Sequence, residues 1–251
     1  MVEVCIDEKT FQTAGGAALT AIRGLLFTVT KGRIACLVGP SGCGKTTTLR
    51  IALGLDRAFE GYIRLPEPMG RIAAVFQEHR LLPWRTVEQN IRLALPGELR
   101  NKNLTALLDE LHILEVADLY PSELSLGLAR RVALARALAI EPSLLLLDEP
   151  FASLDEETAS RLRRLLLDQW SSHKMTILMI THDLAEAAQL ADDIFILSER
   201  PTRVCRTIHL DMPRSSRDAA AIAQIVEDVR IGLREAKVTP LAQQEEPCQT
   251  P

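Results

Sequence analysis

Residues 39–47 of the chain have the types and the spacing that bind phosphate. They read Gly-Pro-Ser-Gly-Cys-Gly-Lys-Thr-Thr and match the pattern G-x-x-x-x-G-K-[ST]. The glycines let the backbone curl so that successive N–H groups point at phosphate oxygens. We expect Lys45 to reach the β- and γ-phosphates of a nucleotide and the Thr46 hydroxyl to bind Mg²⁺. The alternative is a glycine-rich turn with a solvated lysine, which the flanking strand and helix disfavour.

Two carboxylates and a histidine follow other expected strands. Asp148 and Glu149 come directly after the apolar run Leu144–Leu147, and His182 follows Thr176–Ile180. Parallel sheets place active groups at the carboxyl ends of their strands. We expect Asp148 to support the metal, Glu149 to polarise an attacking water, and His182 to contact a γ-phosphate or that water. Surface carboxylates and a structural histidine are the alternatives.

A second anion site is expected where Ser125 and Gly127 open a basic amphipathic helix at Leu128–Ala139. A serine hydroxyl, the N–H groups of a helix start and the helix dipole together attract an anion. A serine here is more often a plain N-cap, but a cap that faces a partner chain can do both. A phosphate loop combined with this site, just ahead of an acidic strand end, indicates an ATPase that works in pairs.

Strands and helices in alternation position these residues. The phosphate loop lies between a buried strand, Ile34–Val38, and a helix, Thr46–Leu53. A charged helix, Glu156–Trp170, joins Leu144–Leu147 to Thr176–Ile180, and a right-handed crossover then makes a parallel sheet. The other expected elements are hairpin turns at Gly15-Gly16 and Lys31-Gly32, strands at Leu25–Thr30, Arg71–Gln77, Ile194–Leu197 and Arg203–Leu210, a helix start at Thr86, helices at Leu104–Leu114 and Ser216–Glu235, and a frayed end at Gln243–Pro251.

Composition excludes several functions. The chain has 251 residues and a net charge of −4, so it lacks the basic field of a nucleic-acid-binding protein. No apolar run approaches the roughly 18 residues that cross a bilayer, and the acidic start does not read as a secretory signal. We therefore expect a cytosolic protein. The 5 cysteines are scattered and predict neither a disulfide framework nor a zinc site.

Taken together, these motifs resemble the nucleotide-binding subunit of ATP-binding cassette (ABC) transporters over roughly residues 3–235. The resemblance implies an α/β fold: a P-loop NTPase core with a parallel sheet, an N-terminal antiparallel β subdomain and a helical signature subdomain at about 86–141, followed by a polar tail at 236–251. It assigns Walker A to Gly39–Thr46, the Q-loop to Gln77, the signature to Leu124–Leu128, Walker B to Leu144–Glu149, the D-loop to Ser153–Asp155 and the H-loop to His182.

The family's chemistry is ATP hydrolysis with Mg²⁺ in a head-to-tail dimer. Lys45 of one subunit and Ser125 of the other would hold the same γ-phosphate, with Glu149 as general base. His182 would position the γ-phosphate and the water, and Thr46, Gln77 and Asp148 would manage the metal. The implied nucleotide contacts are Phe11, Gly39, Pro40, Ser41, Gly42, Cys43, Gly44, Lys45, Thr46, Thr47, Gln77, Ser125, Gly127 and Asp155.

Two of these positions depend on the resemblance alone. Phe11 is placed like the aromatic residue that stacks on adenine in the family, but a phenylalanine there could equally belong to the core. Gln77 would otherwise be taken for a surface glutamine.

Two segments indicate which group of ABC transporters the chain resembles. Val75–Ile91 (VFQEHRLLPWRTVEQNI) and Leu197–Val204 (LSERPTRV) look like the ATPases of bacterial importers for nitrate, taurine, aliphatic sulfonates and bicarbonate, although Thr202 replaces their usual glycine. Such subunits lie on the inner face of the cell membrane, against a permease that works with a periplasmic or extracellular solute-binding protein. The candidate permease contacts are Leu81, Leu82 and Trp84.

The signature departs from the family's usual LSGGQ or LSGGM, because Leu126 and Leu128 replace a glycine and an amide or thioether residue. If position 126 needs a positive φ, leucine costs roughly 1–2 kcal/mol. We expect reduced but not abolished ATPase activity. Two alternatives stay open: a soluble ABC-type ATPase of DNA repair or translation, and a partner cassette that mainly binds ATP. Soluble ABC-type ATPases usually have two cassettes or a coiled-coil insertion. The presence of Glu149 and His182 argues against the partner cassette.

Overall fold

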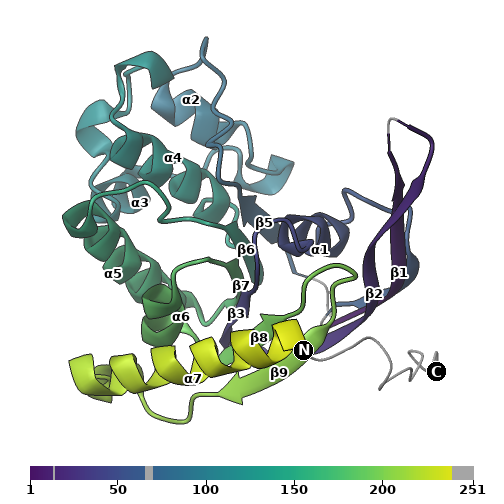
Figure 1. The fold of residues 1–251 in the computed structure, drawn as a ribbon. Helices are drawn as coiled ribbons and strands as arrows, with labels where there is room; N and C mark the ends of the chain where they lie inside the picture. The colour runs from purple at the N-terminus through teal and green to yellow at the C-terminus, as the bar shows by residue number, and fades with distance from the viewer. Residues whose placement is uncertain (14, 66–69, 239–251) are drawn as a thin grey trace. The chain divides into compact units, whose positions relative to one another are not determined.

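The structure is a computed structural model that describes residues 1–13, 15–65 and 70–238 (Figure 1). The chain forms two compact units. The first combines residues 1–69 with residues 177–251, and the second comprises residues 70–176. The expected frayed end at Gln243–Pro251 lies outside the described residues. No helix among the described residues is long and apolar enough to cross a membrane.

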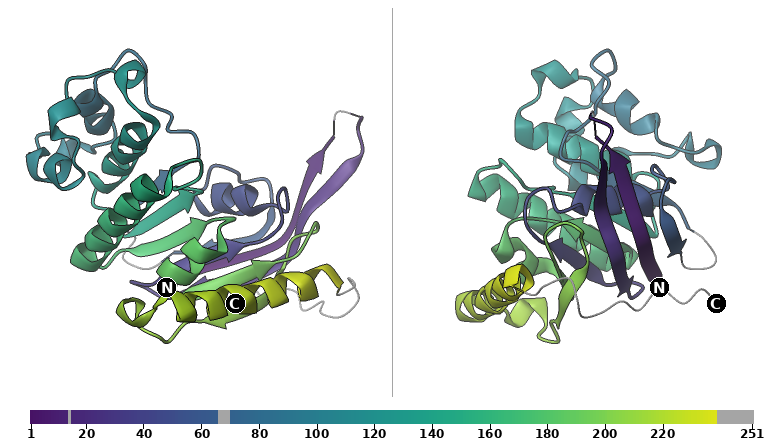
Figure 2. Two further views of the ribbon diagram at one scale, coloured as in Figure 1. Left: turned by 60° about the vertical axis from the view of Figure 1, so that its left-hand side comes forward. Right: turned by 45° about the vertical axis from the view of Figure 1, so that its right-hand side comes forward.

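An antiparallel sheet begins the first unit. It has the order β2-β1-β4, formed by β1 (Val2–Gln12), β2 (Ala18–Val29) and β4 (Glu60–Arg64). β1 and β2 make a long hairpin, which Figure 2 shows from two sides. Its turn contains Gly16 at φ +78°, as the sequence predicts. Side chains at the end of β2 alternate between buried and exposed, which is the pattern of a sheet with one face covered.

Parallel strands form the core of the first unit. β3 (Ile34–Val38) lies between β7 (Thr176–Ile180) and β8 (Asp193–Leu197) and is parallel to both, while β9 (Val204–His209) runs antiparallel to β8. The hairpin expected at Lys31-Gly32 is wrong, because β2 and β3 belong to different sheets. All five side chains of β3 are buried, and such a strand needs neighbours on both sides and cover on both faces.

In its described residues, the first unit has the helices α1 (Lys45–Ala52), α6 (Leu184–Leu190) and α7 (Ala219–Val238). A 3₁₀ turn at Arg214–Ser216 precedes α7. At each end, α7 lies three residues later in the chain than the predicted helix Ser216–Glu235. α7 packs against α6, β8 and β9 (Figure 1). Gly232 permits this approach, because a Cβ there would lie 2.4 Å from Ile196 Cδ1.

The second unit contains two parallel strands, β5 (Ile72–Val75) and β6 (Leu144–Asp148). Four helices accompany them: α2 (Val87–Arg92), α3 (Thr105–Glu110), α4 (Leu126–Leu138) and α5 (Glu156–His173), with 3₁₀ turns at Gly97–Leu99, Leu114–Val116 and Pro121–Glu123. Thr86 begins α2 with a capping box to Gln89, as its sequence indicates. α3 is shorter than the predicted Leu104–Leu114, since His112 adopts a left-handed φ of +52°.

The cysteines of the described residues include three free thiols. Cys36 and Cys43 are buried, and Cys205 is exposed.

An ion pair inside the first unit joins β1 to the segment after α1. The Lys9 ammonium donates to Asp56 Oδ1 and to the Ala58 carbonyl, both at 2.7 Å, and the Lys9 side chain is only 4% exposed. The hydrogen bond from Lys9 is the main reason that the pKa of Asp56 lies below its usual value. This pair therefore stabilises the fold above the pKa of the unfolded carboxyl, near 4, and the stabilisation is lost as the pH falls through the lower, folded pKa.

We expect Asp56→Asn to lower the free energy of unfolding at neutral pH by about 3 kcal/mol, because it leaves a buried ammonium without its counterion. Urea unfolding followed by circular dichroism measures this loss, which should shrink as the pH falls below about 4. The control is Glu8→Gln in the surface pair with Arg23, where both side chains are more than 40% exposed and stability should hardly change. Equal stabilities of wild type and Asp56→Asn at pH 7 would contradict the prediction.

Candidate functional site

The phosphate loop joins β3 to α1 and wraps around its own lysine. Gly42 and Gly44 have φ values of +74° and +125°, conformations that residues with a Cβ rarely adopt. The Lys45 ammonium donates to the carbonyls of Gly39 and Pro40, both at 2.8 Å. Thr46 is exposed in the first turn of α1, at the positive end of the helix dipole. The segment has the features of an anion-binding helix start.

Side chains after β8 hold the outer surface of this loop. Arg200 donates from Nε to the Gly42 carbonyl, and the Thr202 hydroxyl donates to the Cys43 carbonyl. Thr202 is fully buried, and its own N–H donates to the Ala21 carbonyl at 2.9 Å. Burial raises the pKa of the Cys43 thiol inside the loop. In the sequence, Thr202 stands out only because it replaces a glycine. Its contact with the phosphate loop is not predicted from the sequence.

His182 leaves the same sheet edge as the phosphate loop. Leu37 of β3 is paired with Ile180 of β7, so the residues that follow both strands emerge side by side. The His182 side chain is exposed. Its backbone is fixed because the carboxylate of Asp183 caps α6, accepting from Ala185 N at 2.7 Å and Glu186 N at 3.3 Å.

Phe11 lies near the end of β1, in the antiparallel sheet of the first unit. It is 39% exposed and therefore not a core residue. The Lys9 ammonium lies 4.7 Å from its ring centroid, in a cation–π contact. The exposed ring is available for stacking.

The acidic residues gather at one strand edge of the second unit. Asp148 is the last residue of β6 and is buried, and Glu149 follows with a left-handed φ of +48°. Leu147 is paired with Val75 of β5, so Gln77, exposed just beyond β5, emerges at the same edge. Carboxylate and amide oxygens thus come together where parallel strands place active groups.

The signature turn is an N-cap. Ser125 Oγ accepts from Leu128 N at 3.3 Å, and α4 begins at Leu126, two residues earlier than predicted. Leu126 is the first helical residue and is not among the described residues with positive φ. The backbone strain considered for this position is therefore absent. The Leu126 side chain is 45% exposed.

Gly127 has a packing role that its sequence does not reveal. A Cβ at this position would lie 2.8 Å from Thr158 Cγ2, in the first turn of α5. Asp155 caps that turn by accepting from Thr158 N at 2.9 Å, and this hydrogen bond is the first cause that lowers the pKa of Asp155. The signature turn and the D-loop residue are therefore neighbours in the second unit.

The segment after Gln77 is held by buried side chains. The Asn90 amide accepts from Leu82 N at 2.7 Å and donates to the carbonyls of Leu82 and Arg85. Arg136 of α4 donates to the carbonyls of His79 and Arg80. Trp84 points outward and is 67% exposed, while Leu81 and Leu82 are half-buried. Sequence reasoning does not predict the roles of Asn90 and Arg136.

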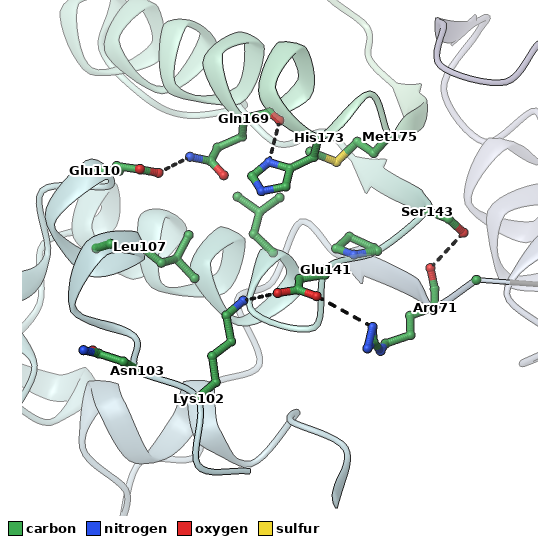
Figure 3. A pocket seen from close by; sticks show the side chains of 14 residues that line it. Arg71, Lys102, Asn103, Leu107, Glu110, Glu141, Ser143, Gln169, His173 and Met175 are labelled. Carbon is green, nitrogen blue, oxygen red and sulfur yellow. Dashed lines mark hydrogen bonds and ion pairs between the residues drawn. The ribbon is translucent and has the colours of Figure 1, made fainter. Parts of the chain in front are cut away.

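A cavity of about 570 Å³ in the second unit does not coincide with these residues (Figure 3). Glu141 lies between Lys102, at 2.8 Å, and Arg71, at 4.0 Å, and Gln169 donates to Glu110. Arg71, Lys102 and Glu141, which line the cavity, pair with one another. None of the predicted site residues lines the cavity. Cavity size therefore does not locate the nucleotide site, which is built from loops at strand ends.

The structure brings the predicted residues together in two groups, one in each unit. The phosphate loop and His182 share a strand edge of the first unit, and Gln77, Asp148 and Glu149 share one in the second. A phosphate loop after a central parallel strand, with an acidic strand end and a capped signature helix, defines an ATP-binding cassette ATPase.

The chain belongs to the ABC transporter family, whose model matches residues 22–152. It is 41% identical over 219 residues to the aliphatic sulfonates import ATP-binding protein SsuB of Bacillus licheniformis, covering 84% of this chain and 86% of that protein. It is 37% identical over 239 residues to SsuB 2 of Pseudomonas syringae pv. tomato, covering 94% of this chain and all of that protein. These relatives identify the ATP-hydrolysing subunit of an ABC importer.

Solved structures agree with this fold. The dimeric structure of MJ0796, a bacterial ABC transporter cassette, has a TM-score of 0.73 and 28% identity, covering 85% of this chain and 100% of that one. A dimeric post-hydrolysis state of the same cassette, bound to ADP and Pi, has a TM-score of 0.72 and 29% identity, with the same coverage. The α/β fold is confirmed, and the chain binds ATP and acts as a dimer with a membrane permease.

We expect Gly127→Ala to destabilise the second unit by about 1–3 kcal/mol through overpacking against Thr158, and to lower steady-state ATP hydrolysis. Thr158→Ser removes the contacting methyl and keeps its backbone N–H, so the double variant should recover both properties. Thermal unfolding and phosphate release measure them. A Gly127→Ala protein with normal stability and activity would contradict this account.

Leu126→Gly removes a side chain at the neighbouring position, whereas Gly127→Ala adds one, and it is compared with wild type in the same assays. It relieves no backbone strain, so any gain in hydrolysis comes from removing the exposed side chain. An unchanged rate would show that Leu126 is harmless.

Proposed function

We propose that this subunit hydrolyses ATP to drive the import of an aliphatic sulfonate or a related small oxyanion. The observation that carries the proposal is the similarity to sulfonate import proteins, which extends over 84–94% of the chain. It includes the phosphate loop, the acidic strand end and the loop that presents Trp84.

The first unit would bind the triphosphate. The N–H groups of the loop at 39–46 and the dipole of α1 attract its oxygens, and Lys45 exchanges its two carbonyl partners for β- and γ-phosphate oxygens. The exposed ring of Phe11 would stack on adenine. The backbone contacts from Arg200 and Thr202 keep the loop in its curled conformation.

The residues present suit Mg²⁺. The hydroxyl of Thr46, the amide of Gln77 and the carboxylate of Asp148 all offer oxygen, the ligand that this hard cation prefers. Thr46 and Gln77 are exposed, and both emerge next to the carboxyl end of a parallel strand. A Mg²⁺ ion held by these residues would neutralise the negative charge that develops on the phosphate oxygens. We assign these three residues to hold it.

Glu149 and His182 would direct the transfer to water. A water oxygen forms a bond to the γ-phosphorus while the bond to the β-phosphate oxygen breaks, and Glu149 takes the proton of that water. His182 holds the γ-phosphate and the attacking water in line. Catalysis is then mainly positioning and electrostatics, as in other phosphoryl transfers.

The trans half of each site would come from the second subunit. Ser125, Gly127 and the start of α4 would meet the γ-phosphate bound by the partner's Walker A loop, with Asp155 close by. Ser125 already serves as the N-cap, and its hydroxyl can also donate outward. The exposed Leu126 favours a second candidate function, a partner cassette with weak hydrolysis.

The membrane permease would dock on the loop at 81–85. Trp84 is a large apolar side chain left 67% exposed on a loop that Asn90 fixes, which is typical of an interaction surface. Leu81 and Leu82 border it. The subunit would thereby lie on the cytoplasmic face of the membrane, and the periplasmic or extracellular solute-binding protein would act through the permease.

We expect Glu149→Gln to bind ATP but to lose hydrolysis by at least about 100-fold, because the general base is removed while the phosphate loop is unchanged. The trapped ATP should hold the protein as a dimer, which size-exclusion chromatography with and without ATP detects. A matched Lys45→Ala variant should lose the ATP-dependent dimer.

A hydrolysis rate in Glu149→Gln equal to that of wild type would remove Glu149 from this role. Slow wild-type hydrolysis that Glu149→Gln leaves unaltered would instead favour the weakly catalytic partner cassette.

We expect Trp84→Ala to keep the ATPase rate of the isolated protein and to lose most solute uptake, since it removes only the docking side chain. Uptake of a radiolabelled alkanesulfonate by cells that carry this ATPase with its permease is the measurement, with nitrate, taurine and bicarbonate as competitors.

Leu55→Ala is the matched control, because Leu55 is also exposed, at 60%, and lies outside this loop. Full uptake with Trp84→Ala would refute the docking site. Competition by nitrate or bicarbonate, but by no sulfonate, would refute the solute class.

A further inference from the structure

Arg130 of α4 is a buried arginine whose guanidinium binds backbone carbonyls. It is 5% exposed. Its Nη1 donates to the carbonyls of Glu149 and Pro150 at 3.0 and 2.9 Å, and its Nη2 donates to the carbonyl of Ala152 at 2.6 Å. One guanidinium therefore holds three carbonyls of the turn that follows β6. The planar fork of arginine suits such an arrangement, which the point charge of lysine cannot reproduce.

The turn that Arg130 holds is conformationally costly. Glu149 has φ +48° and Ser153 has φ +61°, so two residues with side chains adopt the left-handed region within five positions. Inside the turn, Ala152 N donates to Glu149 O and Leu154 N donates to Phe151 O, and both hydrogen bonds are weak at 3.3 Å. Such conformations persist only where the surroundings impose them.

The other support of the turn is apolar. Phe151 is 3% exposed, and the Arg163 guanidinium lies 5.9 Å from its ring centroid. Leu147, Leu162 and Leu166 line the same small space as Phe151 and Arg130. Apolar packing anchors Phe151 but fixes no carbonyl direction. The hydrogen bonds from Arg130 supply that direction at Glu149, the residue whose side chain must face the water.

We propose that Arg130 is a positioning residue for hydrolysis, which locks the peptide of Glu149 to the signature helix so that the carboxylate is aimed at the attacking water. This inference rests on the proposed role of Glu149 as the base. Arg130 acts through the backbone of Glu149, Pro150 and Ala152. Its effect is on the turnover rate, not on ATP binding, because the phosphate loop belongs to other elements.

The test compares Arg130→Met, Arg130→Lys and the exposed Arg164→Met on α5 with wild type in steady-state ATPase assays. We expect Arg130→Met to lower kcat on the order of 100-fold, the cost of misplacing a catalytic group by about 1 Å, with KM nearly unchanged. Arg130→Lys should recover part of kcat, and Arg164→Met should match wild type. Thermal unfolding checks each variant.

A second measurement separates positioning from folding. Arg130→Met combined with Glu149→Gln should still form the ATP-dependent dimer seen with Glu149→Gln alone. The proposal is overturned if Arg130→Met keeps the wild-type kcat, or if the combined variant loses the ATP-dependent dimer because folding or binding has failed. If Arg130→Met does not fold, a wild-type kcat in Arg130→Lys overturns the proposal and a selective loss of kcat supports it.

The two proposals fail in different ways. If Glu149→Gln hydrolyses ATP as fast as wild type, the role of Glu149 fails and the inference on Arg130 falls with it. If Glu149→Gln is inactive while Arg130→Met is fully active, only the role of Arg130 fails.

Discussion

Register between parallel strands of the core is the constraint on which the site depends. β3 pairs with β7 so that Leu37 lies opposite Ile180, and β5 pairs with β6 so that Val75 lies opposite Leu147. A shift by one residue would turn every buried side chain to the other face, so the apolar cover fixes these registers. Because both members of each pair end together, the loops that follow them emerge side by side. The phosphate loop with His182, and Gln77 with Glu149, thus obtain their positions from the packing of leucine, isoleucine and valine.

Loops at these edges are irregular, and polar side chains hold them by hydrogen bonds to their carbonyls. Arg200 and Thr202 act on the phosphate loop, Asn90 on the loop of Trp84, and Arg130 on the turn of Glu149. Arg200, Thr202 and Arg130 reach these carbonyls from elements distant in sequence, whereas Asn90 lies five to eight residues from the loop carbonyls that it binds. Backbone groups that cannot join a helix or sheet still need partners, and these donors meet that need while they fix one conformation.

Sequence alone predicts the elements around the candidate site better than the contacts that hold them. Three predicted features have local causes and are found in the structure: the helix start at Lys45, the strand that ends at Asp148 and the helix cap at Thr86. The hairpin at Lys31-Gly32 was wrong because a local turn signal does not say which sheet the next strand joins. The strain considered at Leu126 is absent because the helix starts earlier than its periodicity suggests. The contacts of Gly127 with Thr158 and of Arg130 with Glu149 link distant segments, so no local pattern reveals them.

The lysine of the phosphate loop has a thermodynamic consequence for which anions can bind. The Lys45 ammonium already donates to two carbonyls at 2.8 Å, inside the loop and largely out of solvent. An incoming anion gains only the difference between its own hydrogen bonds and those it displaces. A lone sulfate or phosphate gains little, whereas a triphosphate also engages the loop N–H groups and adds the contacts of its nucleoside. This internal competition acts as an affinity threshold, which small anions do not pass.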